Sequence, residues 1–598
     1  MSIKPIFTAI IVAAIFVNCK NNSPEKQPNS SKNQSTDFNA LLENYYEEGL
    51  KLNPINATFS GDPRYNNSFP NFLSDDYMEE MRNYYITFQE KASKFDDAHL
   101  SETEKMSKEV LLWECEINLE KLKFNQNIYF PIDQMWSVNL LMGQLASGKS
   151  AQPFETVADY KHWLERMDGY VTWLSTAQTR MQEGMDRGYV LPKSLIVKVL
   201  PQLKEMTLPD VDKHLFFSPV KQFPSSISEE DQKLLRVAYA EMITEKIVPA
   251  YANLYTFMSG DYLKAGRETS GIADTPDGKE YYIHQIKSYT NSEMSPGEIH
   301  ELGLKEVARI SSEMEKVKEQ LGFKGNLKAF FNEVRNNKQL MPFMEPQQIL
   351  AHFSKIHETM KPSLEVLFDQ KPKTPFEIKQ TEKFRESSAS AEYNPGSIDG
   401  TRAGVFYVPI PDARHYNIYS DESLFLHEAI PGHHYQISLT QENDNLPMFR
   451  KTLFYSAYGE GWALYSESLG KELGLYTDPY QYFGMLGAEI HRAIRLVVDT
   501  GLHDKGWTRE QAIQYCLDHE AEPEAGIISE VERYMANPGQ ALSYKIGQLK
   551  IMELRKKAKM VLGDKFDIRE FHNRVLETGC IPLQLLEGKM DKWIDSQK

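Results

Sequence analysis

A proline and a glycine interrupt a histidine-rich segment of the chain. This segment, residues 424–436, reads LFLHEAIPGHHYQ. Pro431 has no backbone N–H, and its ring clashes with the carbonyl group four residues earlier, which belongs to His427. Gly432 tolerates almost any backbone conformation. A regular helix cannot continue through this segment, so the backbone must bend between the histidines on its two sides.

The histidines on both sides of this interruption predict a zinc site. Glu428 directly follows His427, as in the His-Glu-x-x-His motif, where two histidines bind zinc and the glutamate reaches the bound water. On a regular helix, His434 lies about 20° from the face of His427 and His433 about 120° away. If two residues loop out at the Pro-Gly pair, His433 takes the place of the second ligand. We expect His427 and His433 to bind the metal, with His434 as the alternative ligand or as a residue that orients one.

A third ligand is expected from a helix further along the chain. Residues 454–469 read FYSAYGEGWALYSESL, a helical pattern with Glu460 and Glu467 on one face. Two histidines need an oxygen ligand that leaves one position open for water. We predict that Glu460 is this ligand and that Glu467 orients a ligand histidine. The glycines on both sides of Glu460 predict the close approach of another helix.

Three polar residues further on share one stripe of a helical segment. Arg495, Asp499 and His503 are spaced by four residues. One interpretation is that Arg495 and His503 bind the carboxylate of a peptide while Asp499 supports a metal ligand. The alternative is an ordinary Arg-Asp pair on the surface.

Two tyrosines flank a Pro-Gly turn near the C-terminus. Tyr534 and Tyr544 lie in predicted helices on either side of it. A tyrosine hydroxyl aimed at a metal-bound carbonyl would stabilise the oxyanion of a tetrahedral intermediate. Either tyrosine could take this role, and packing is the alternative for each.

Residues 394–411 read NPGSIDGTRAGVFYVPIP, a turn-rich run followed by a short strand at residues 405–408. Zinc peptidases commonly hold a peptide by adding it to an exposed strand beside the metal helix. We expect Gly404 and Phe406 to bind substrate at such an edge. A small structural hairpin is the alternative.

Helical periodicity dominates the remainder of the chain. Apolar residues recur at helical spacing through residues 38–387, and capping patterns begin at Ser101 and Ser295. We predict a mainly α fold with a short β element beside the metal helix. A helical N-terminal part at residues 38–390 and a helical catalytic part at residues 391–598 are expected to pack as one compact unit.

The N-terminus predicts export. Residues 1–19 have a basic start and an apolar run of about 13 residues, ending at Cys19, which is typical of a bacterial lipoprotein signal with Cys19 acylated. A signal cleaved without lipidation is the alternative. The polar residues 20–37 are expected to form a disordered tether to the membrane. We therefore expect a protein of the cell envelope, periplasmic or anchored only by its lipid. The net charge of −17 argues against nucleic-acid partners.

Four motifs together resemble one known family. They are HEAIPGHH from His427, GEGWALYSE from Gly459, RLVVDTGLH from Arg495, and Tyr-x-x-x-Pro-Gly-Gln-Ala-Leu-Ser-Tyr from Tyr534. The sequence resembles the bacterial domain-of-unknown-function 885 family from about residue 38 to residue 595.

This resemblance implies a helical fold with a deep central cleft, like that of the gluzincin peptidases thimet oligopeptidase and carboxypeptidase Taq. It also implies that His427, His433 and Glu460 match the metal positions of the family and that Glu428 matches its catalytic glutamate.

These inferences combine into a predicted mechanism. We expect Zn²⁺ to lower the pKa of a bound water, and Glu428 to take its proton while the water attacks a peptide carbonyl. A cleft in a helical body would admit short unfolded peptides, which predicts an oligopeptidase or a carboxypeptidase. The alternatives are a zinc hydrolase of a non-peptide amide and a non-catalytic peptide-binding lipoprotein of the envelope.

Overall fold

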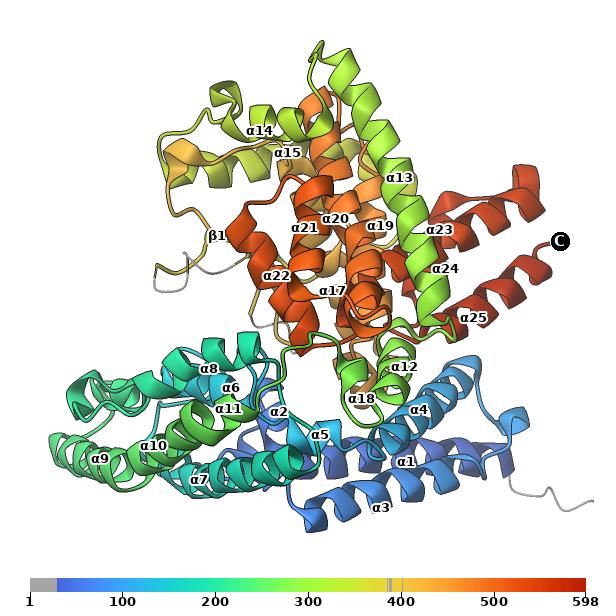
Figure 1. The fold of residues 1–598 in the computed structure, drawn as a ribbon. Helices are drawn as coiled ribbons and strands as arrows, with labels where there is room; N and C mark the ends of the chain where they lie inside the picture. The colour runs from blue at the N-terminus through green and yellow to red at the C-terminus, as the bar shows by residue number, and fades with distance from the viewer. Residues whose placement is uncertain (1–29, 384–385, 387–389, 399, 401) are drawn as a thin grey trace, which may run out of the picture.

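The computed structural model describes the chain except for residues 1–29, 384–385, 387–389, 399 and 401. The predicted signal peptide, Cys19 and the first part of the predicted tether lie outside the described residues. In Figure 1 the N-terminal helices, blue to green, form a lower layer, and most helices from α13 (Pro296–Gln320) onward form an upper body. The described residues contain one small sheet among many helices, which confirms the prediction of a mainly α fold.

Helices of the first two thirds of the chain are α1 (Ser30–Leu52), α2 (Pro54–Phe59), α3 (Asp75–Ala92), α4 (Glu102–Lys121), α5 (Gln126–Tyr129), α6 (Val138–Ala146), α7 (Val157–Asp186), α8 (Lys193–Glu205), α9 (Glu229–Met242), α10 (Val248–Phe257), α11 (Leu263–Ala265), α12 (Gly278–Thr290), α13, α14 (Leu327–Asn336) and α15 (Pro346–Leu367). After them come the strands β1 (Phe376–Gln380), β2 (Glu392–Asn394) and β3 (Gly404–Val408). The remaining helices are α16 (Asp421–Glu428), α17 (His433–Gln441), α18 (Met448–Thr452), α19 (Ser456–Ser468), α20 (Pro479–His503), α21 (Arg509–His519), α22 (Glu524–Ala536), α23 (Ser543–Leu562), α24 (Ile568–Leu576) and α25 (Leu583–Ser596).

Helices begin at both capping patterns that the sequence predicted, those at Ser101 and Ser295. Ser101 and Glu104 form a reciprocal capping box at the start of α4. Ser295 and Glu298 form another at the start of α13. Each box satisfies backbone N–H groups that a helix N-terminus leaves without partners.

The first helix begins earlier than expected. Helix α1 starts at Ser30, so the last part of the predicted tether, residues 30–37, is helical rather than disordered. Glu104 at the start of α4 accepts hydrogen bonds from Ser35 and Asn39. These contacts give a polar segment the tertiary partners that its composition alone does not reveal.

The three strands are arranged in the order β1-β3-β2. Strand β3 pairs with β1 in parallel and with β2 in antiparallel orientation, so it is the central strand of the sheet. The prediction that Gly404 and Phe406 form an exposed substrate-binding edge is therefore wrong. Phe406 is fully buried, and a Cβ on Gly404 would lie 2.2 Å from the Tyr393 hydroxyl. The two edge strands beside β3 are β1 and β2.

Buried apolar side chains form two clusters. The smaller one lies within residues 55–263 and is centred on aromatic residues of α7, such as Trp163 and Tyr170. The larger one extends from Phe38 to Ile594. It joins both sides of the boundary that we placed near residue 390, since the rings of Phe353 and Phe406 lie 5.2 Å apart.

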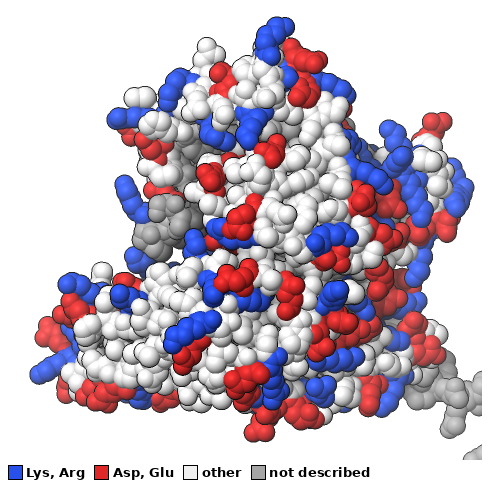
Figure 2. Space-filling model, viewed as in Figure 1, with Lys and Arg blue, Asp and Glu red and all other residues white. Residues whose placement is uncertain are grey.

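Charged side chains of both signs are interspersed on the face of the molecule in Figure 2. No continuous basic patch covers the described residues that are visible there. Across the part of the chain that the structure describes, no helix has the length and apolar character of a membrane span.

Helices α19 and α23 approach at glycines. A Cβ built on Gly461 would lie 2.5 Å from Cα of Gly547, and one built on Gly547 would lie 1.8 Å from the carbonyl oxygen of Ala457. Ser456 and Ser543 share a hydrogen bond of 2.7 Å between the same helices. The close helix approach predicted from the glycines around Glu460 is confirmed at Gly461. The other glycine, Gly459, instead leaves room for the ring of Phe454.

Replacing Gly547 with alanine should destabilise the protein, because the new methyl group forces α19 and α23 apart. We expect a loss of about 3 kcal/mol in the free energy of unfolding, seen as a lower thermal midpoint by circular dichroism. Gly487→Ala is the matched control, because Gly487 lies within α20 and a Cβ added there would have nothing within 4 Å. Alanine there should be neutral or stabilising by up to about 1 kcal/mol. Equal midpoints for the two variants would contradict the tight helix contact.

Candidate metal centre

The structure brings together the three residues predicted as metal ligands. His427 lies near the end of α16, His433 begins α17, and Glu460 lies in α19. Oε2 of Glu460 is 3.6 Å from Nε2 of His427 and 3.4 Å from Nε2 of His433. One ligand atom from each residue lies within 4.8 Å of the others.

The helix breaks completely between the two histidines. Helix α16 ends at Glu428 and α17 begins at His433. The backbone at Gly432 folds back so closely that a Cβ there would lie 1.9 Å from the carbonyl oxygen of His427. The Trp462 indole donates a 2.8 Å hydrogen bond to the carbonyl of Pro431. The predicted bend is therefore a loop between two separate helices, held from α19.

The chemistry and spacing of these three side chains fit zinc. Two imidazoles and one carboxylate are a common catalytic zinc ligand set, which leaves a further position for water. Ligand atoms about 2.1 Å from a tetrahedral ion lie roughly 3.4 Å from one another. The two distances measured from Glu460 match this separation.

Glu467 holds the ring of His427 from behind. Its Oε1 lies 2.8 Å from Nδ1 of His427, and Ser423 donates to its other oxygen. This contact turns Nε2 of His427 toward Glu460. Carboxylates that hold the outer nitrogen of a ligand histidine fix its tautomer and orientation. The placement is the one expected for Glu467 from the sequence.

The carboxylates make the centre favourable for a cation. Burial lowers the pKa of His427, but hydrogen bonds with Glu460 and Glu467 outweigh it and raise the pKa to about 9. Burial raises the pKa of Glu460, but the charge of His433 and hydrogen bonds with both histidines hold it well below its usual value. Groups that favour a proton on His427 also favour a metal ion in its place.

Glu428 is the last residue of α16 and is buried beside the ligands. Burial raises the pKa of its carboxyl group, the charges of His427 and His433 oppose this rise, and that of Glu460 adds to it. Arg492 also lowers this pKa. A carboxylate with a raised pKa is suited to accept a proton and return it.

His434 lies outside the ligand group. Its Nδ1 is 2.9 Å from the Tyr393 hydroxyl and 3.3 Å from Ser438 Oγ, and its ring packs against Phe376. Burial lowers its pKa to about 4, so the ring is neutral near pH 7. His434 joins α17 to the sheet, and the expectation that it binds or orients a metal ligand is wrong.

Asp499 and His503 also have structural partners. Asp499 accepts hydrogen bonds from the Tyr282 hydroxyl at 2.6 Å and from the N–H of Gly539. His503 bonds to the N–H of Ile272 and the carbonyl of Tyr534. Both therefore stabilise the junction of α20 with α12 and the Pro-Gly turn. The expectations that Asp499 supports a ligand and that His503 binds substrate are wrong.

The two candidate tyrosines differ in their surroundings. The Tyr534 hydroxyl donates to Glu530 at 2.9 Å and accepts from Nε of Arg495 at 3.2 Å. Tyr544 is half-buried, with the guanidinium of Arg495 4.5 Å from its ring centre. Its hydroxyl has no hydrogen bond to another residue that the structure describes. The geometry therefore favours Tyr544 for contact with a substrate.

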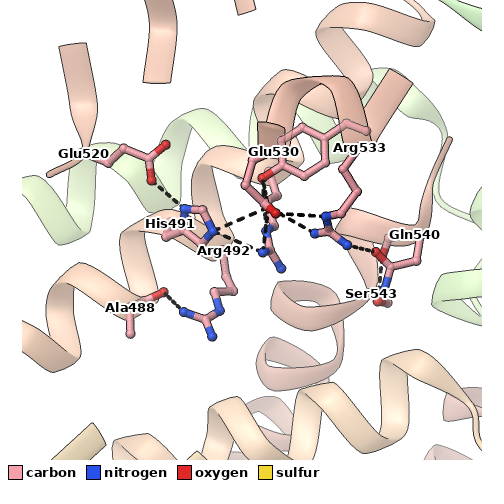
Figure 3. A network of polar contacts seen from close by, with 10 residues as sticks. Ala488, His491, Arg492, Glu520, Glu530, Arg533, Gln540 and Ser543 are labelled. Carbon is pink, nitrogen blue, oxygen red and sulfur yellow. Dashed lines mark hydrogen bonds and ion pairs between the residues drawn. The ribbon is translucent and has the colours of Figure 1, made fainter. Parts of the chain in front are cut away.

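Arg492 is a candidate functional residue that the sequence analysis missed. It lies one turn before Arg495 on α20 and donates to the carbonyl of Ala488 at 3.2 Å (Figure 3). The spacing to Arg495 was visible in the sequence, but nothing there indicated that its charge acts on Glu428.

A cavity of about 1740 Å³ lies near the metal ligands, although His427, His433 and Glu460 are not among its lining residues. Its lining includes aromatic residues of α1, α3 and α18, such as Tyr45, Tyr84 and Phe449, together with Glu392 and Asn394 of the edge strand β2. Another lining residue connects it to the metal ligands. This is Phe454, whose ring centre lies 6.5 Å from that of His433.

Comparisons with known proteins agree with this architecture. A crystal structure of a candidate lipoprotein from Colwellia psychrerythraea is similar, with a TM-score of 0.84 and 28% identity over 94% of this chain and 99% of that one. A candidate lipoprotein of unknown function from Shewanella oneidensis gives a TM-score of 0.73 and 19% identity over 92% and 99% of the two chains. PZ peptidase A gives a TM-score of 0.29 and 10% identity over 87% of this chain and 97% of that one.

No curated protein matches the chain. A family model described as bacterial protein of unknown function (DUF885) matches residues 54–590. Since this match spans most of the sequence, the chain belongs to the DUF885 family.

Proposed function

We propose that this protein is a zinc-dependent peptidase that hydrolyses short peptides in the cell envelope. The observation that carries the proposal is the convergence of His427, His433 and Glu460, with Glu428 buried beside them. These residues come from three helices. The loop between α16 and α17 allows both imidazoles to approach the Glu460 carboxylate.

Each residue of the centre has a chemical role. His427, His433 and Glu460 would hold zinc, which would supply Lewis-acid activation of a water molecule. Glu428 would accept a proton from the water that attacks the peptide carbonyl and would deliver it to the leaving amine. The hydroxyl of Tyr544 donates a hydrogen bond to the oxyanion that develops on the carbonyl oxygen.

The cavity supports a peptide as the substrate. Its volume of about 1740 Å³ exceeds the roughly 300–1,000 Å³ of ordinary small-molecule sites. Strand β2 lies at the edge of the sheet and contributes Glu392 and Asn394 to the lining. A peptide can add to such an edge through its main chain. Location in the envelope is supported by the similar candidate lipoproteins and by the predicted lipid anchor at Cys19.

Neighbouring histidines provide a matched test of metal binding. His433→Ala should lose bound zinc, because it removes a ligand, whereas His434→Ala should retain it, because His434 faces Tyr393. Metal content of purified protein, measured by elemental analysis after incubation with zinc, checks this. Loss of metal in His434→Ala alone would show that the second ligand is wrongly assigned.

Glu428→Gln should retain zinc but lose activity, because glutamine cannot accept the proton. We expect kcat on a peptide library to fall by about 10²–10⁴. Wild-type activity in this variant would exclude Glu428 as the proton acceptor. A wild-type protein that binds zinc but cleaves only non-peptide amides would overturn the substrate class.

Glu467→Ala should weaken zinc binding without removing a ligand. The loss of the hydrogen bond to Nδ1 leaves His427 free to rotate, and we expect about 10- to 100-fold lower zinc affinity. Competition with a chelator measures the change. Glu472→Ala is the control, because Glu472 is a glutamate that follows α19 in sequence and pairs with Arg555 rather than with a metal ligand. Equal affinities in both variants would exclude the orienting role of Glu467.

A further inference from the structure

Two arginines of α20 have guanidinium nitrogens without a hydrogen-bond partner among the residues that the structure describes. Arg495 is only 7% exposed, and its buried Nη1 lacks a hydrogen-bond partner. Arg492 is half-buried, and its buried Nε also lacks one. Burying a charged donor without an acceptor costs free energy, so such groups usually have a partner, which can be a bound ligand.

The acidic side chains nearby are already engaged. Glu530 pairs with both Arg495 at 3.0 Å and Arg533 at 3.1 Å. Glu520 pairs with His491. Figure 3 shows the guanidinium of Arg492 apart from these carboxylates, with its dashed contact running to Ala488. Arg492 forms no ion pair with any described residue, so no direct carboxylate contact neutralises its charge.

This positive charge lies beside the metal centre. Helix α20, which carries both arginines, packs against α16, which carries His427 and Glu428. The charge of Arg492 lowers the pKa of Glu428. Arg495 stacks over Tyr544 of α23, and α23 packs directly against α19, which carries Glu460. The large cavity is lined by Phe454, which neighbours His433, and by the C-terminal part of α17, and neither arginine lines it.

We propose that Arg492 and Arg495 bind the C-terminal carboxylate of the peptide, which makes the protein an exopeptidase that acts at the C-terminus. Guanidinium groups match carboxylates in shape and charge. The N-terminal portion of the peptide occupies the cavity, and the bond near its free carboxylate lies at the metal centre. Hydrolysis breaks that C–N bond, the carbonyl carbon gains the water oxygen, and the leaving nitrogen gains a proton from Glu428. This inference rests on the proposed peptidase function.

The test compares peptides that differ only at the C-terminus. For the zinc-loaded full-length protein, we expect kcat/KM for a free-acid peptide to exceed that of its C-terminal amide by at least about 100-fold, with KM carrying much of the difference. Arg492→Ala should remove most of this preference, read as the ratio of kcat/KM for the acid to kcat/KM for the amide within the same variant. Arg492→Lys should retain part of it, which guards against loss through misfolding.

Arg569→Ala is the control, because Arg569 is exposed on α24 and pairs with Asp567. It should keep the full preference for the free acid. Equal cleavage of acid and amide by the wild type, or cleavage at internal bonds of both, would overturn the proposal while leaving a zinc peptidase intact.

A binding measurement separates this proposal from the peptidase function. In the Glu428→Gln background, calorimetry should show that the free-acid peptide binds at least about 10-fold more tightly than the amide, and that Arg492→Ala abolishes the difference. If the wild type cleaves no peptide, the peptidase function fails and this measurement alone decides the carboxylate site. Equal binding of acid and amide would overturn the site.

Discussion

The close contact between the backbone of Gly432 and the carbonyl oxygen of His427 determines the placement of the metal ligands. A side chain at Gly432 would collide with that carbonyl, so the reversal between α16 and α17 requires glycine. The indole of Trp462 fixes the same loop through the carbonyl of Pro431. Because Trp462 and Glu460 both belong to α19, one helix supplies the oxygen ligand and also holds the loop that positions the histidines.

Buried charge fixes the helices behind this centre. Lys545 of α23 is fully buried and bonds to Glu489 of α20 at 2.7 Å and to Glu306 of α13 at 3.0 Å. Breaking a buried pair leaves an uncompensated charge, which costs several kcal/mol. The network therefore restricts how α20 can move relative to α23. Arg495 and Tyr544 lie on these same two helices, and their stacked arrangement benefits from that restraint.

Local sequence signals predicted much of the fold and of the site. The capping boxes, the interruption at Pro431 and the spacing of Glu460 and Glu467 depend on neighbours in sequence or on one helical face, and these features appear in the structure. Strand order could not be predicted, because β1, which places β3 at the centre, is separated from it by a long turn-rich stretch. The roles of Asp499 and His503 depend on distant partners in α12 and the segment before it, so regular spacing alone was misleading.

The large cavity lies between the two hydrophobic clusters. Its walls include Tyr251, which belongs to the smaller cluster, and Tyr45 and Phe449, which belong to the larger. Any molecule that fills this space touches two separately packed bodies at once. A ligand that binds only the folded protein stabilises it by an amount that rises with ligand concentration relative to its Kd. A bound ligand therefore links the two clusters, and the thermal midpoint of the whole protein should rise as the cavity becomes occupied.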